Sequence, residues 1–188
     1  MKMVESEGMK RYQDSGFNLK MSVVLLFMIL LLSACVYGAG RDSINRSTVE
    51  NFDLKSFMGR WYEIARFDHS FERGMQGVTA DYSLQEDGTV LVVNSGKRGD
   101  KRVEAIGRAK TTSQVGRLRV SFFWIFYSDY NVLDMGKDGE WVLVGSRSPQ
   151  YLWVMSRKPH MSDEELKHII NLAEQRGYNT NNLIFVEH

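Results

Sequence analysis

The sequence predicts an all-β fold, an eight-stranded antiparallel up-and-down barrel with one C-terminal α-helix and a short final strand. Two observations support this prediction. Eight short apolar-rich runs are separated by hairpin-sized segments that contain Gly, Asp or Pro, such as residues 86–88 and 136–139. No segment with helical periodicity lies between these runs to form parallel crossovers. An antiparallel meander that closes on itself is therefore favoured, because closure removes the exposed strand edges.

The predicted strands follow one another along the chain, beginning at Gly59. They comprise residues 59–67, 77–84, 89–94, 102–109, 117–123, 130–135, 140–146 and 150–156. Since successive strand side chains point to opposite faces of a sheet, every second residue in each run is expected to face the barrel interior.

The predicted helix follows the last of these strands. Ser162 and Glu165 have the spacing of a capping box, acidic residues occupy the first turn, and Gly177 provides a stop. An apolar stripe at i, i+3, i+4 and i+7 should lie against the outside of the barrel. It consists of Leu166, Ile169, Ile170 and Ala173. Residues 183–186 are expected to form a last strand that returns to the barrel.

Composition excludes several classes of function. A chain of 188 residues with 43% hydrophobic and 25% charged residues suits one globular domain, and a net charge of +1 is too small to recruit nucleic acid. The single cysteine excludes an intramolecular disulfide and a thiolate metal cluster. The histidines lack metal-ligand spacing and are expected on the surface or in loops, so no metal or cofactor is predicted. They are His69, His160, His168 and His188.

The N-terminal segment has the features of an export signal. Residues 21–34 are apolar but shorter than the ~20 residues that span a bilayer. The sequence Leu-Ser-Ala that precedes Cys35 resembles the bacterial lipoprotein signal, which implies that Cys35 becomes an acylated N-terminus. Val36, where Asp favours inner-membrane retention, implies the outer membrane. An ordinary secretory signal with an incidental cysteine is the alternative. The expected organisation is a signal peptide (1–34), a lipidated, flexible tether (35–50) and a folded domain (51–188).

Two motifs carry a family resemblance. Gly59-Arg60-Trp61 opens the first strand, and residues 151–157 match a family's closing motif. With these motifs the sequence resembles the lipocalins, in particular the bacterial lipoprotein members of the apolipoprotein D group. The resemblance implies that Arg157 lies across Trp61 as a cation-π pair, closing the barrel base beside Gly59. The family's middle motif, Thr-Asp-Tyr, is absent from residues 133–139.

The resemblance also implies an open cavity for a hydrophobic ligand. Strand parity, combined with that of related barrels, gives the expected lining: Ala80, Tyr82, Val92, Asn94, Val120, Phe122, Tyr130, Val144, Tyr151 and Trp153. The alternative is that these side chains fill a solid core. Phe67, His69, Phe71 and residues 123–127 are expected around the mouth, where they fold over the entrance or meet lipid.

The leading functional hypothesis is a non-enzymatic protein that binds, stores or transports fatty acids or lysophospholipids, tethered to a membrane through acylated Cys35. The alternatives are a lipid-modifying enzyme and an envelope scaffold with a plugged barrel. Ser146 and Ser148 lack the nucleophile elbow of serine hydrolases, and Glu63 is assigned a structural role. A homodimer is compatible with the sequence, which does not decide the oligomeric state.

Overall fold

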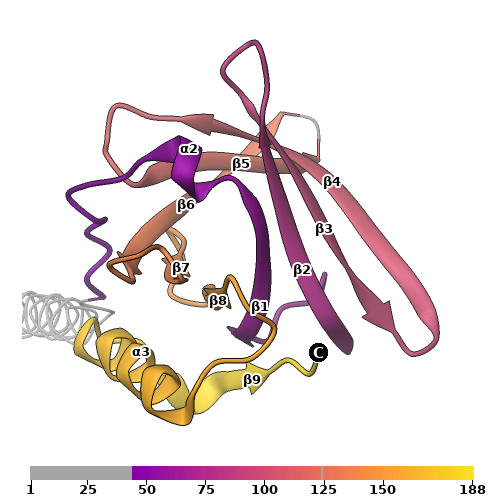
Figure 1. Cartoon of the computed structure of the whole chain (residues 1–188), viewed down its shortest axis with the longest axis vertical. Helices are drawn as coiled ribbons and strands as arrows, with labels where there is room; N and C mark the ends of the chain where they lie inside the picture. Colours follow the sequence, from indigo (N-terminus) through magenta and orange to yellow (C-terminus); the bar gives the residue numbers. More distant parts are fainter. Residues whose placement is uncertain (1–43, 124) are drawn as a thin grey trace, which may run out of the picture. The chain divides into compact units, whose positions relative to one another are not determined.

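The computed structural model describes residues 44–123 and 125–188, so the predicted signal peptide and Cys35 lie outside the described residues. Eight strands form the barrel (Figure 1). They are β1 (Gly59–Phe67), β2 (Met75–Leu84), β3 (Val90–Arg98), β4 (Lys101–Thr111), β5 (Arg117–Phe123), β6 (Phe126–Met135), β7 (Trp141–Gly145) and β8 (Leu152–Ser156). The other elements are α2 (Leu54–Phe57), α3 (Asp163–Gln175), the 3-10 turn η1 (Thr180–Asn182) and β9 (Leu183–Phe185).

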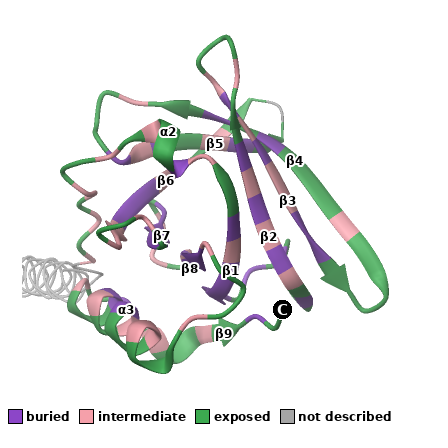
Figure 2. Cartoon of the chain, viewed as in Figure 1, coloured by how far each residue is buried: buried purple, intermediate pink, exposed green. Residues whose placement is uncertain are grey.

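The strand order confirms the antiparallel up-and-down barrel. Each of β2 to β7 pairs with the next strand in the sequence, and β1 pairs with both β8 and β2, which closes the sheet. Burial alternates along β2 and β3, as a barrel with one interior face requires (Figure 2). β4 is largely exposed, with only Gly107 and Ala109 buried, and the β3–β4 hairpin is longer than predicted because β3 continues to Arg98.

The closure between β1 and β2 is direct over only half of its length. β1 pairs with β2 from Gly59 to Tyr62, whereas its later residues pair with β9 on that side. The C-terminal residues bridge the rest of the seam, since Gly77 donates its N–H to the carbonyl of Glu187 at 2.7 Å. The seam therefore divides the barrel into a tightly paired end and a looser one.

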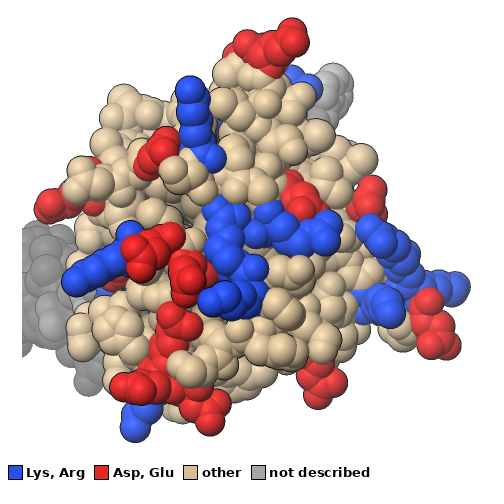
Figure 3. All heavy atoms as spheres, viewed as in Figure 1, with Lys and Arg blue, Asp and Glu red and all other residues tan. Residues whose placement is uncertain are grey.

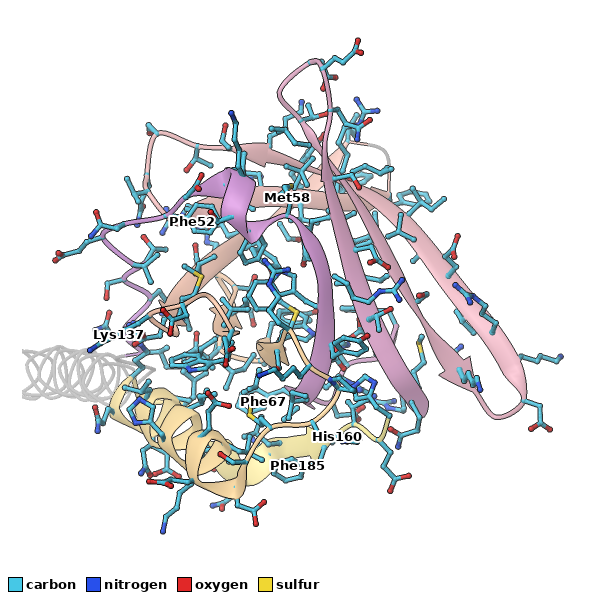
Figure 4. All side chains as sticks on the ribbon, in the orientation of Figure 1. Phe52, Met58, Phe67, Lys137, His160 and Phe185 are labelled. Carbon is cyan, nitrogen blue, oxygen red and sulfur yellow. The ribbon has the colours of Figure 1, made fainter. Side chains whose placement is uncertain are left out.

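The predicted helix is confirmed as α3. The Ser162 hydroxyl accepts a hydrogen bond from the Glu165 N–H, and Gly177 follows the helix with φ +90°. Ile169 and Ala173 are fully buried in a cluster on the outer face of the barrel. Phe67 and Phe185 lie at this side of the molecule, and Phe52 and Met58 lie near α2 (Figure 4).

Two local predictions are wrong. β6 begins at Phe126 and not at the predicted residue 130, and Phe126 pairs directly with Phe123 of β5. Residues 44–50 are not a flexible tether. Asn45 donates its N–H to the Arg176 carbonyl at 2.8 Å, Val49 donates to the Val132 carbonyl at 3.0 Å, and Val49 packs against the interior cluster. For residues 35–43 the tether stays a prediction.

Candidate ligand-binding cavity

The base of the barrel is closed by Trp61 and Arg157. The Trp61 side chain is fully buried, and its indole N–H donates to the Phe57 carbonyl of α2 at 2.9 Å. The Arg157 guanidinium lies 3.7 Å from the centre of the Trp61 ring and donates to the backbone carbonyls of Arg60 and Ser56. Gly59 begins β1 with φ +90°, a conformation that other residues rarely adopt. This arrangement is the one that the family resemblance implies.

Above this base the barrel encloses a cavity of about 440 Å³. Nine of the ten predicted lining residues lie on its wall: Ala80, Tyr82, Val92, Asn94, Val120, Phe122, Tyr130, Tyr151 and Trp153. Val144 does not, although it pairs with Trp153 in the sheet, because it is fully buried within the interior cluster. Strand parity gives the face to which a side chain points but not its depth. A larger hollow, of about 610 Å³, lies outside the barrel between α3 and the β6–β7 turn, and it is open to solvent.

The deep part of the cavity is lined by aromatic side chains whose hydroxyl groups hydrogen-bond to each other. The hydroxyl groups of Tyr82 and Tyr130 are hydrogen-bonded at 2.9 Å, and both rings meet Phe57 edge-on. Burial raises the pKa of Tyr82, so this hydroxyl stays neutral. Since each hydroxyl group already has a partner, the two residues provide an uncharged end wall.

A buried charged cluster lies on the wall near β1, and sequence analysis missed it. Arg66 is 1% exposed; it donates to the Glu63 carboxylate at 2.7 Å and to the backbone carbonyl of Glu72 at 2.8 Å. Strict alternation would place Glu63 and Arg66 on opposite faces. The register of β1 against β8 shifts between Glu63 and Ala65, and this bulge brings both side chains to one side.

Glu63 and Glu72 both line the cavity, and both are titratable groups in an unusual environment. Burial raises the pKa of Glu63 to about 8, with a further contribution from the negative charge of Glu72 and opposition from Arg66. Burial also raises the pKa of Glu72. Trp153 donates its indole N–H to Glu72 at 3.3 Å.

His69 follows β1 in a loop, as predicted, but it is not a surface residue. Its side chain is 6% exposed and stacks on Phe71, with a centroid separation of 4.0 Å. Burial lowers its pKa to about 4, so the imidazole is neutral at physiological pH. In residues 44–123 and 125–188, no group of three or more His, Cys, Asp or Glu side chains could hold a metal ion.

The rim of the cavity is apolar and exposed. The side chains of Phe71, Phe122, Phe123 and Phe126 all line the cavity and are between 43% and 74% exposed; Ile125, in the same hairpin, is 65% exposed. Phe67, which was also expected here, is 5% exposed and packs against Tyr178 outside the barrel. Both signs of charge are mixed across the face shown in Figure 3. No helix in the described part of the chain is long and apolar enough to cross a membrane.

An antiparallel barrel with a blocked base and an apolar cavity that reaches its rim defines a class of carriers for small hydrophobic molecules. Residues 52–188 match the model of the lipocalin-like domain. The chain belongs to the lipocalin family, whose members bind small hydrophobic ligands and are not enzymes.

Relatives and solved structures agree with this assignment. The outer membrane lipoprotein Blc of Citrobacter freundii is 42% identical over 145 residues, covering 75% of this chain and 82% of that protein. Rat apolipoprotein D is 32% identical over 138 residues, covering 64% of this chain and 68% of its own. Insecticyanin from the tobacco hornworm Manduca sexta has the same fold, with a TM-score of 0.63 at 17% identity over 76% of this chain and 84% of its own. Lobster apocrustacyanin A1 has a TM-score of 0.61 at 15% identity, covering 72% and 79%.

Proposed function

We propose that this protein binds, stores or transports single-chain amphiphiles such as fatty acids or lysophospholipids at the bacterial outer membrane, to which acylated Cys35 tethers it. The observation that carries this proposal is the cavity of about 440 Å³, whose volume falls within the ~300–1,000 Å³ typical of small-molecule sites. A scaffold with a plugged barrel would leave no such space.

The lining favours a ligand with one apolar chain and one polar end. Ala80, Val92 and Val120 provide apolar wall, and the small side chain of Ala80 leaves room beside them. The polar groups of Glu63 and Glu72 lie nearer the loop that follows β1. An acyl chain in the deep part would therefore leave the polar end of the ligand toward the mouth.

The membrane setting draws on the relatives and on the rim. The Blc relatives are named outer membrane lipoproteins. Cys35 stands directly after Leu-Ser-Ala, and acyl chains at this position would hold the protein at a bilayer. The exposed rim of Phe123 and Phe126 suits transfer of a ligand between lipid and cavity, since exposed apolar patches of soluble proteins mark interaction surfaces.

Titration with saturated fatty acids of increasing chain length tests the ligand proposal, with Trp153 emission as the signal and calorimetry as the check. Each added methylene contributes at most ~0.8 kcal/mol, so affinity should rise with length and level off when the cavity is full. Ala80→Phe should shorten the preferred chain. If correctly folded protein shows no saturable binding at any length, the proposal is wrong and the scaffold alternative gains.

Membrane fractionation tests the anchor separately. Cys35→Ser should release the protein from the membrane fraction, because the acylation site is lost. A distribution equal to that of the wild type would contradict lipidation at Cys35 without affecting the ligand proposal.

A further inference from the structure

The ionisable groups on the cavity wall all carry the same sign. The lining residues given by the described part of the chain include Glu63, Glu72 and Asp129 but neither Lys nor Arg. Asp129 is already paired, since Arg119 lies 3.5 Å from its carboxylate. Glu63 and Glu72 are 4% and 5% exposed and together have one cation, Arg66. The cavity wall therefore presents more carboxyl groups than cations to a bound ligand.

Other polar groups of the wall and of the cluster also lack partners. The Oδ1 atom of Asn94, on β3, is a buried acceptor without a hydrogen bond. His69 is buried, and neither ring nitrogen makes a hydrogen bond, although Nε2 lies 3.2 Å from a Glu72 oxygen. Buried polar groups normally have partners, so orphaned groups beside a cavity indicate that a ligand supplies them. An acceptor such as Asn94 Oδ1 requires a hydrogen-bond donor from the ligand.

We propose that the polar end of the preferred ligand is a primary ammonium group, which Glu63 and Glu72 hold between their carboxyl groups. This inference rests on the proposed function and, among single-chain amphiphiles, ranks those with a primary ammonium group above fatty acids. The ammonium group offers three N–H donors and a positive charge, which suit the two carboxyl groups, and the unfilled acceptor on Asn94 stands on the same cavity wall.

Because of the charge balance of the site, binding of an ammonium group should release a proton. Without ligand, burial raises the pKa of both Glu63 and Glu72, which favours one proton shared by the pair, and Arg66 balances the remaining negative charge. An ammonium group brings a second positive charge, so the shared proton leaves to solvent and the site stays neutral. The other groups that act on this pair are His69 and Tyr82, which are neutral. His188 touches only the Glu63 backbone carbonyl.

Other head groups fit the wall less well. A carboxylate beside Glu63 and Glu72 would add a third acidic group against one cation, so a fatty acid must keep its head at the mouth. A hydroxyl group can donate one hydrogen bond but brings no charge to replace the shared proton. Among ligands of equal chain length that bind at the same depth in the cavity, the amine should therefore bind most tightly, the alcohol less tightly and the carboxylate least tightly.

Calorimetric titration with dodecylamine, dodecanol and dodecanoate tests this order on the chain from residue 35 onward carrying Cys35→Ser, which contains all described residues. The amine is charged throughout the range from about pH 6 to about pH 9. At about pH 9 it should bind at least about tenfold more tightly than the alcohol. Its affinity should increase with pH, whereas that of the alcohol should not. Titrations in buffers of different ionisation enthalpy should show release of about one proton per amine bound.

Two variants test whether the preference for the amine depends on the Glu63 and Glu72 pair or on any acidic residue of the cavity wall. Glu72→Gln keeps an acceptor for Trp153 and should reduce the preference for the amine to within about threefold. Asp129→Asn removes the lining acid that Arg119 already pairs and should keep the full preference. If Glu72→Gln fails to fold, the pH dependence and the proton count of the unmodified cavity still decide the matter.

The outcomes separate this inference from the proposed function. Equal or weaker binding of the amine than of the alcohol, or amine binding without proton release, would overturn the ammonium site while leaving the carrier function intact. Failure of all three ligands to bind would contradict the carrier function itself.

Discussion

The two ends of the barrel differ in how their polar groups are paired and in how far their apolar side chains are exposed. At the closed end, the Trp61 indole and the Arg157 guanidinium both donate to backbone carbonyls. At the open end, Glu63 and Glu72 are buried carboxyl groups with raised pKa values, and Phe123 and Phe126 are exposed to water. The closed end is built for stability. The open end accepts buried charge and exposed apolar surface, and such exceptions are expected where a protein binds.

Strand pairing shows the same difference. From Gly59 to Tyr62, β1 pairs with β2 without interruption. Register shifts occur farther along, between Glu63 and Ala65 of β1 and between Gln76 and Thr79 of β2. Bulges bend strands and redirect side chains, and the bulge of β1 brings Arg66 beside Glu63. Irregular pairing thus accompanies the polar site, although β6 also has a register shift, between Val132 and Asp134.

The largest effect is expected at the closed end. Trp61→Ala removes a fully buried indole that contacts Phe57 and Arg157, so the free energy of unfolding should fall by ~3–5 kcal/mol. Urea denaturation followed by circular dichroism measures this loss. A variant as stable as the wild type would show that the base does not hold the barrel together.

A smaller loss is expected when Arg157 is removed. Arg157→Ala gives up the contact with the Trp61 ring and hydrogen bonds to two carbonyls, for a cost of about 1–2 kcal/mol. Arg157→Lys keeps a cation over the ring but loses the planar fork, so its stability should lie between those of the wild type and the alanine variant. Neither change should alter ligand affinity, because Arg157 does not line the cavity. Lost binding at unchanged stability would contradict this assignment.

Stability should also depend on pH through the open end. The pKa of Glu63 is raised to about 8, so its contribution is full below about pH 4.5 and is lost as pH rises through about 8. His69, with its pKa lowered to about 4 from 6.5, contributes above pH 6.5 and loses this contribution as pH falls through 4. The two effects oppose each other at mildly acidic pH. Between pH 6.5 and about 8 the contribution of His69 is constant and that of the Glu63 and Glu72 pair declines, so Tm should fall.

Calorimetry over this pH range checks the prediction, with Glu63→Gln as the reference. The amide cannot titrate, so the variant should lose the decline in Tm between pH 6.5 and about 8, even though its Tm is lower overall. A variant that keeps the full decline would assign it to other groups.

Strand parity made much of the cavity predictable. Alternation along the strands, combined with the parity of related barrels, gave ten residues, nine of which line the cavity. Parity failed at the bulge of β1, because one extra residue there moved Arg66 to the inner side. It also said nothing about Glu72, since the loop from residue 68 to 74 has no periodicity. The missed residues are therefore those that make the polar site.

The packing of chain ends was equally hard to predict. Residues 44–50 have the Ser and Asn content of a linker, yet Val49 and Ile44 each pack against an apolar cluster. The short helix α2 was missed because a single turn has too few residues for a periodic pattern. Such segments adopt their structure only because the folded barrel provides a surface against which they pack.

The smallest effect on stability, and the sharpest contrast between the two ends, is expected from the exposed apolar residues. Phe123→Ser and Phe126→Ser together remove stacked rings that are 74% and 68% exposed, so the free energy of unfolding should change by no more than about 0.5 kcal/mol per substitution. Burial of these rings in lipid would be lost, and vesicle binding should therefore drop several-fold. Val115→Ser provides the matched control, because Val115 is 50% exposed in the hairpin at the closed end.

Cosedimentation with phospholipid vesicles measures this effect in the Cys35→Ser background, where no anchor holds the protein to the bilayer. The wild-type rim should bind, the Phe123 and Phe126 variant should remain in solution, and the Val115 control should bind as the wild type does. Equal binding of all three proteins would mean that lipid contact does not occur at the rim. The rings would then serve to cover the cavity entrance, and the same variant should instead release its ligand faster, because the entrance is less covered.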